Sequence, residues 1–160
     1  MLLGAAVSLF LYLYQFPQKI DLAYPAMEYR AGKPESAEAI TIKVKGMLTK
    51  PLFRKQTFRG KIIIDKYEFT KTYNLIDLDF SQWNNDFYDD NLYYYHVDVN
   101  GSLVSRPLGS LVISDQFAQL NIWVMEKIGE TSWTGKDLHI SAPARNYEEA
   151  VKINEDLFGY

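Results

Sequence analysis

Strict alternation of apolar and polar side chains constrains the fold of this chain more than any other feature of its sequence. Residues 40–45 alternate Ile, Ile and Val with Thr, Lys and Lys. The same period of two recurs in residues 58–65, 76–80 and 120–124. Successive side chains of a strand point to opposite faces, so this period indicates half-buried strands. The chain is therefore expected to be mainly β.

Turn residues separate these segments and predict antiparallel pairing. Asn100-Gly101 stands between two β-like runs, and both residues tolerate the positive φ that a tight hairpin needs. Asp65-Lys66 has the spacing of a second hairpin turn. Roughly seven to nine short strands predict an antiparallel β-sandwich or a curled sheet.

The C-terminal residues alone follow a helical pattern. Asn146 followed by Glu149 fits a capping box, and acids at the start of a helix suit its dipole. Apolar residues then fall mainly on one stripe. One amphipathic helix is expected over residues 146–158, covering part of the sheet.

Residues 1–16 are almost wholly apolar and are predicted to form a helix, with no charge before Lys19. A membrane span needs about 20 residues, a few more than this run supplies. An uncleaved single-pass membrane anchor, truncated at its basic start, is the favoured interpretation. A buried helix of a soluble domain and a cleaved signal peptide are the alternatives. Residues 17–39, rich in Pro, are expected to be a linker, and residues 40–160 a β domain.

The net charge is −3, and the charged residues are unevenly distributed along the chain. Residues 41–71 contain nine Lys or Arg and two acids, whereas residues 72–105 contain six acids and no Lys or Arg. Cross-strand pairing of the two segments is one interpretation. The other is a basic surface that binds anionic lipid or a wall polymer. Its residues would be Lys43, Lys45, Arg54, Lys55, Arg59 and Lys61. The mildly acidic total argues against a nucleic-acid partner.

Catalytic patterns are weak in this sequence. It has no Cys, which excludes thiolate chemistry and disulfides, and it has no serine-hydrolase, phosphate-loop or dinucleotide motif. No cofactor is expected, and a non-enzymatic role is favoured. The least implausible acid and base groups are His96, Asp98 and His139.

Two further groups are candidates for ligand binding. Exposed aromatic rings can stack on a sugar or a small molecule, and carboxylates are ligands for Ca²⁺. The aromatic candidates are Tyr93, Tyr95 and Trp123, and the weaker metal candidates are Asp86, Asp89 and Asp90.

The segments 52–55, 58–62 and 65–69 resemble a pattern in small membrane-anchored exported proteins of Gram-positive bacteria. This resemblance implies an extracytoplasmic β domain on a single-pass anchor, and it implies no catalytic or binding residue. The leading hypothesis is a membrane-tethered β domain with a binding or structural role at the cell surface. A carbohydrate- or small-ligand-binding module, or a hydrolase of unrecognised type, is the alternative.

Overall fold

In the computed structural model of this protein, nine antiparallel strands of the described residues form a single sheet. The structure describes residues 4, 7–10, 14, 16–52, 54–82 and 87–158. The elements are β1 (Pro17–Arg30), β2 (Lys33–Thr49), β3 (Gln56–Ile64), α2 (Phe69–Thr72), β4 (Asn74–Leu75), β5 (Leu78–Gln82), β6 (Phe87–Val97), β7 (Leu103–Ser114), the 3₁₀ turn η1 (Asp115–Phe117), β8 (Leu120–Lys127), β9 (Trp133–Ala142) and α3 (Tyr147–Phe158).

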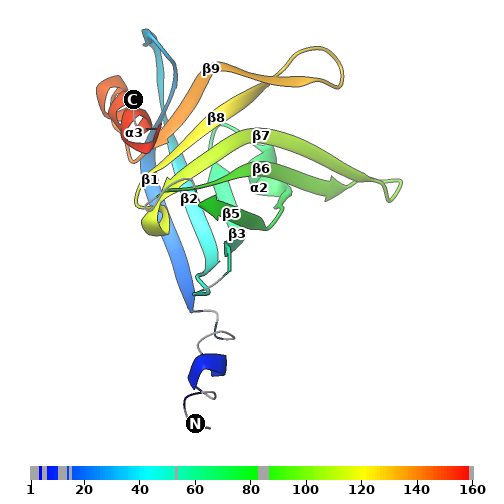
Figure 1. The fold of residues 1–160 in the computed structure, drawn as a ribbon. Helices are drawn as coiled ribbons and strands as arrows, with labels where there is room; N and C mark the ends of the chain where they lie inside the picture. The colour runs from blue at the N-terminus through cyan, green and yellow to red at the C-terminus, as the bar shows by residue number, and fades with distance from the viewer. Residues whose placement is uncertain are drawn as a thin grey trace.

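The sheet closes on itself. The strand order is β4-β6-β5-β3-β2-β1-β9-β8-β7, and β6 also pairs with β7. Strands β4 and β5 pair with different stretches of β6, the first at Tyr94 and Tyr95 and the second at Tyr88 and Asp89. Figure 1 shows the strands curving around a common interior. The predicted mainly β, antiparallel class is confirmed, and the sheet is continuous and curled.

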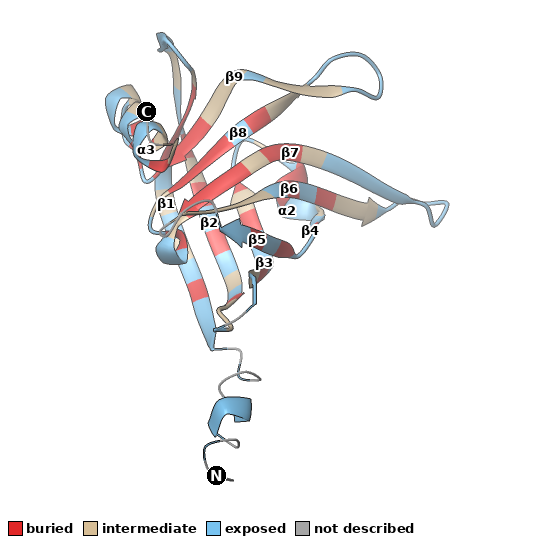
Figure 2. Cartoon of the chain, in the orientation of Figure 1, coloured by how far each residue is buried: buried red, intermediate tan, exposed pale blue. Residues whose placement is uncertain are grey.

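One face of every long strand points into this interior, which side chains fill. The alternation predicted for residues 40–45 places Ile42 and Val44 inside, both without exposed surface. Phe117 is buried from the turn η1 and packs between Phe58 and Phe80, with ring centroids 5.0 and 5.9 Å away. Figure 2 shows the alternation of buried and exposed residues along the strands.

Helix α3 packs on the outer face of the sheet, which confirms the predicted C-terminal helix. Its buried residues Ala150, Ile153 and Leu157 join a second apolar cluster that includes Met27 and Tyr29 of β1. The predicted cap is also present. The backbone N–H of Glu149 donates to the Asn146 side chain at 2.8 Å, and the Glu149 carboxylate accepts from the backbone N–H of Arg145.

The expectation of a linker over residues 17–39 is wrong. Strand β1 pairs with β2 from Pro17 opposite Thr49 to Arg30 opposite Lys33, with one register shift near the Arg30 end. The prolines misled the prediction because proline tolerates strand positions whose N–H is not needed in the ladder. The alternation of Ile20 with later apolar residues of β1 was the signal for a strand.

The expected hairpin at Asp65-Lys66 is also absent. These two residues form a turn, but the chain then enters the short helix α2 instead of a returning strand. The buried hydroxyl of Thr70 in α2 bonds both the backbone N–H and the carbonyl of Ile64. This contact holds α2 against the end of β3. The hairpin predicted at Asn100-Gly101 does form, between β6 and β7, with Gly101 at φ 80°.

The N-terminal residues that the structure describes lie outside the sheet. Gly4 and residues 7–10 are helical, and Leu9 and Phe10 are each more than half exposed. Within the described ranges, no helix has both the length and the apolar character needed to cross a bilayer.

Two glycines face each other where β2 and β3 approach most closely. Gly46 pairs with Gly60 in an uninterrupted register. A Cβ on Gly60 would lie 2.2 Å from the carbonyl oxygen of Lys45, and one on Gly46 would lie 2.3 Å from that of Arg59. Real Cβ atoms do not approach backbone this closely, so only glycine permits this packing.

We predict that Gly60→Ala destabilises the fold, because the clash is with backbone that cannot rotate away. Urea unfolding should show a loss of about 1–3 kcal/mol, the range for overpacking. Lys61→Ala is the matched control, because Lys61 is the next residue along the strand and truncating its exposed side chain leaves the close contact of the two strands intact. Equal stability of the two variants would contradict the prediction.

Candidate functional site

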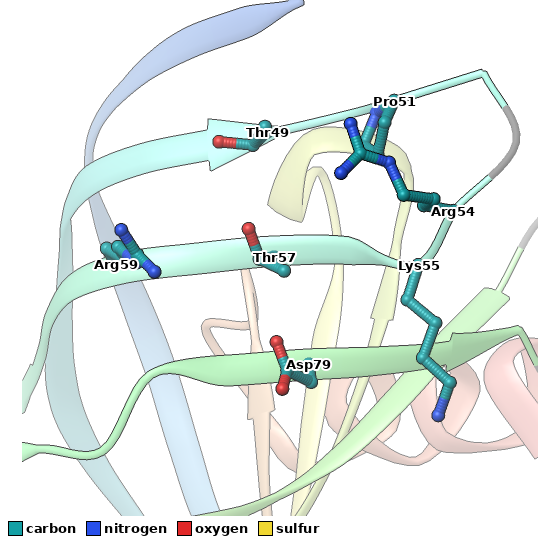
Figure 3. Close-up of a pocket in the computed structure, with 7 residues that line it drawn as sticks. All are labelled: Thr49, Pro51, Arg54, Lys55, Thr57, Arg59 and Asp79. Atoms are coloured by element: carbon teal, nitrogen blue, oxygen red, sulfur yellow. The ribbon is translucent and has the colours of Figure 1, made fainter. Parts of the chain in front are cut away.

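A basic pocket lies where β2 ends and the chain crosses to β3. Thr49, Thr57 and Asp79 stand opposite one another on β2, β3 and β5, on the outer face of the sheet. The connection from β2 to β3 contributes Pro51, Arg54 and Lys55 to one wall. The hollow is about 330 Å³, and its lining residues are Thr49, Pro51, Arg54, Lys55, Thr57, Arg59 and Asp79. Figure 3 shows these side chains.

The same connection borders a second hollow of about 570 Å³. Its lining includes Lys50, Arg54 and Lys55 together with Phe80 and Tyr88. Arg54 and Lys55 therefore border both hollows. The ion pair of Lys50 with Asp115 ties the connection to the turn η1, and this cation lowers the pKa of the Asp115 carboxyl.

The pocket side chains are donors of the kind that bind phosphate or carboxylate groups. Arg59 forms an ion pair with Asp77 at 2.8 Å, but more than half of each side chain is exposed. Such a pair is screened by water and contributes little to stability. Lys55 reaches the Ser81 hydroxyl at 3.3 Å. Two arginines, a lysine and two threonine hydroxyls surround a single lining acid, Asp79, so the pocket attracts anions.

Basic side chains continue from the pocket along the outer face of β2 and β3. Lys45 stands directly opposite Lys61, a like-charge pair that destabilises a sheet. Asp21 of β1 partly offsets it, 3.4 Å from Lys45. Within the described ranges, Lys43 and Lys61 make no ion pair. We call these residues and the pocket the basic face: Lys43, Lys45, Arg54, Lys55, Arg59 and Lys61.

The pocket end of the basic face lies where β1 begins. Pro17, the first residue of β1, pairs with Thr49, which lines the pocket. Figure 1 shows the described helical residues 7–10 beyond the Pro17 end of β1, at the end of the sheet where β2 connects to β3. The exposed apolar side chains Leu9 and Phe10 therefore belong to the same end as the cationic pocket.

The interpretation of the charge segregation as cross-strand pairing holds at one position of the described chain. Arg59 of the basic segment pairs with Asp77 of the acidic segment. The described acids bonded to other basic-segment residues come from elsewhere. Lys66, for example, bonds Glu28 at 2.7 Å and also Glu38.

The three candidate acid and base residues do not share a site. His96 of β6 is opposite Val104, whereas His139 of β9 is opposite Trp123 of β8. The Asp98 carboxylate accepts hydrogen bonds from the backbone N–H groups that follow it in the turn, at 2.8 and 2.9 Å. The ring of His96 stacks on Tyr73, 4.0 Å between centroids, and its buried Nδ1 has no partner within the described ranges.

His139 occupies the middle of an aromatic stack on the outer face. Its ring is nearly parallel to Trp123, at 6.2 Å, and inclined by 25° to Tyr29, at 5.8 Å. Burial lowers the pKa of the His139 imidazole from its ordinary value of 6.5. The stack therefore favours the neutral ring.

The aromatic ligand candidates are divided between two strands. Tyr93 and Tyr95 lie on β6, with Tyr93 39% exposed. Trp123 lies on β8 and donates its indole N–H to the carbonyl of Lys136 at 2.8 Å. No ring contact joins Trp123 to either tyrosine in the described chain.

Two of the three acidic metal candidates, Asp89 and Asp90, are strand residues. Asp89 and Asp90 are consecutive in β6, so their side chains point to opposite faces. Asp90 accepts a hydrogen bond from the backbone N–H of Asp79 at 2.6 Å. Asp86 lies outside the described residues, and among those described no group of three acids or histidines is arranged to hold a metal.

Sequence reasoning missed the two threonines and the acid of the pocket. Thr49, Thr57 and Asp79 come together only through the pairing of three strands. The Thr49–Thr57 pair belongs to the same ladder as the Gly46–Gly60 pair, and no local motif signals the register of the three strands. Comparison with protein-family models, curated proteins and solved structures finds no significant match.

We predict that the His139 imidazole titrates below 6.5 in an NMR experiment that follows its ring protons. The folded state then binds fewer protons than the unfolded chain just below pH 6.5, so stability should decrease as pH falls through that window. His139→Phe retains a ring in the stack, and its stability should depend less on pH between 7 and 5. A measured pKa at or above 6.5 would contradict the prediction.

Proposed function

We propose that this protein is a membrane-tethered, extracytoplasmic β domain that binds anionic lipid headgroups through its basic face. The observation that carries the proposal is the position of that face. It shares one end of the molecule with the apolar N-terminal segment, because Pro17 pairs with Thr49 at the edge of the pocket. Residues 1–16 serve as the membrane anchor in this proposal.

Electrostatics supports binding at this end. Each Lys or Arg near an anionic bilayer contributes about 1 kcal/mol, and the attraction fades within a Debye length of about 8–10 Å. Cations close to the anchor contribute most, and Arg54 and Lys55 lie in the connection beside β1. The proposal also explains why Lys45 and Lys61 stand opposite each other, because an anionic surface relieves the repulsion between the two ammonium groups.

The pocket gives this surface a place for a discrete headgroup. Guanidinium groups bind phosphate oxygens through paired N–H donors, and threonine hydroxyls can donate to the remaining oxygens. Figure 3 shows Thr49 and Thr57 side by side, with Arg54 and Arg59 at either end of the hollow. A phosphate-bearing headgroup fits this donor set better than a sugar, for which an exposed aromatic platform is needed.

Vesicle binding by the full chain tests the proposal. We expect tighter binding to phosphatidylcholine vesicles that also contain phosphatidylglycerol than to phosphatidylcholine alone, and this gain should disappear at high salt. The triple variant Arg54→Gln, Lys55→Gln, Arg59→Gln should lose about 3 kcal/mol of the gain, about a hundredfold in affinity. Co-sedimentation measures both.

The matched control removes three cations from elsewhere. Lys127→Gln, Lys136→Gln, Lys152→Gln makes the same change in net charge at exposed positions away from the pocket. This variant should retain the phosphatidylglycerol-dependent gain. Equal losses in the two triple variants would show nonspecific charge attraction. Insensitivity to phosphatidylglycerol, with binding to an anionic wall polymer instead, would overturn the lipid proposal.

A further inference from the structure

Strands β7 and β8 separate part-way along their length. They pair only from Gly109 to Ile113 of β7. Residues 103–107 of β7 pair with β6 alone, and residues 125–127 of β8 pair with β9 alone. Figure 1 shows the β6–β7 and β8–β9 hairpins diverging. We call this opening the fork; it lies beyond the Arg30 end of β1, away from the basic face.

Three local features create the fork. At its base, a Cβ on Gly109 would lie 2.2 Å from the carbonyl oxygen of Trp123, so the two strands are in unusually close approach. The β6–β7 register shifts between Leu92 and Tyr93, and the β8–β9 register shifts between Trp123 and Met125. Irregularities of this kind bend a strand and are common beside binding sites. Both walls of the fork bend at the same level.

The β7 wall presents an unpaired backbone edge. The backbone N–H of Asp98 donates to the carbonyl of Ser102 at 2.9 Å. Because hydrogen-bonding direction alternates along a strand, this bond places the N–H and C=O groups of Leu103 and Ser105 on the edge away from β6. No strand of the described chain pairs with that edge. Leu103 is also 69% exposed.

A fixed cation lies inside the fork. Arg106 is opposite the buried Tyr94, and its guanidinium carbon is 4.0 Å from the ring centroid of Phe69 and 5.5 Å from that of Trp133. Stacking on aromatic rings orients a guanidinium group. Within the described part of the chain, Arg106 makes no ion pair. The adjoining hollow of about 540 Å³ is lined by Val104, Ser105, Arg106, Lys127, Glu130, Thr131 and Trp133.

We propose that the fork binds an extended peptide segment that carries an acidic side chain. The peptide adds a strand to the free edge of β7 through Leu103 and Ser105, and its carboxylate pairs with Arg106. Arg106 and Lys127 outnumber the single acid of the hollow, Glu130, so the lining complements a negative charge. In this proposal the peptide lies between the free edge of β7 and the β8–β9 hairpin, whose residues Lys127 and Trp133 line the same hollow.

Selection from a phage-displayed library of random peptides against the full chain tests the proposal. We expect enriched sequences with alternating apolar residues and at least one Asp or Glu. Synthetic versions should bind about tenfold or more weakly to Arg106→Gln, the loss expected when a hydrogen bond to a charged group is removed. Arg145→Gln, exposed and outside the fork, is the matched control and should bind normally.

The backbone contribution is tested separately. Ser105→Pro removes one edge N–H and no bond to β6, and Pro107 shows that this edge accepts proline. It should abolish binding. N-methylation of alternate amides of the peptide should also abolish binding in one register and spare it in the other, which tests strand addition in the unaltered protein.

Three results would overturn the proposal. The first is a selection that enriches no sequence. The second is peptide binding that tolerates both Arg106→Gln and N-methylation in either register. The third is a concentration-dependent dimer of the wild-type chain that Ser105→Pro dissociates, because the edge would then be occupied by a second copy of this chain.

Discussion

Burial of one face of every strand in a single interior is the interaction on which the rest of this structure depends. Each fully buried aliphatic or aromatic side chain contributes about 1.5–3 kcal/mol, and this gain must offset the entropy of ordering long strands. A curled sheet buries one face of every strand only when it closes on itself. The β6–β7 ladder closes the sheet, the Gly46–Gly60 pair permits the close approach of β2 and β3, and Phe117 packs between Phe58 and Phe80 in the interior.

The two ends of the closed sheet differ in chemistry. The end at Pro17 carries cations that remain largely in water. Near Arg30, charges are instead neutralised within the fold. Glu28 is 6% exposed and accepts hydrogen bonds from Tyr67 at 2.5 Å and Lys66 at 2.7 Å. Two residues along the strand, Arg30 forms an ion pair with Glu126. Burial and the neighbouring Glu28 raise the pKa of the Tyr67 hydroxyl. A buried carboxylate needs such partners, so these groups serve the fold.

Local patterns predicted the parts of the fold that depend on neighbouring residues. The Asn100-Gly101 turn, the strand from residue 40 and the α3 cap at Asn146 all follow from steric or hydrogen-bonding preferences within a few positions. The β1 strand was missed because its prolines resemble a linker, and its pairing with β2 resolves that ambiguity. The cations of the pocket were predicted as a basic surface, but Thr49 and Asp79 were not, because strand register brings them there.

The sequence by itself determined that this chain is β-rich, antiparallel and unevenly charged, since periodicity and composition are properties of adjacent residues. Only the tertiary structure decided that the sheet closes, that the cationic pocket lies at the end of the sheet where β1 begins, and that β7 and β8 separate around Arg106. These features depend on contacts between residues distant in sequence. Such contacts are fixed by strand register and by how side chains from different strands pack together in the shared interior.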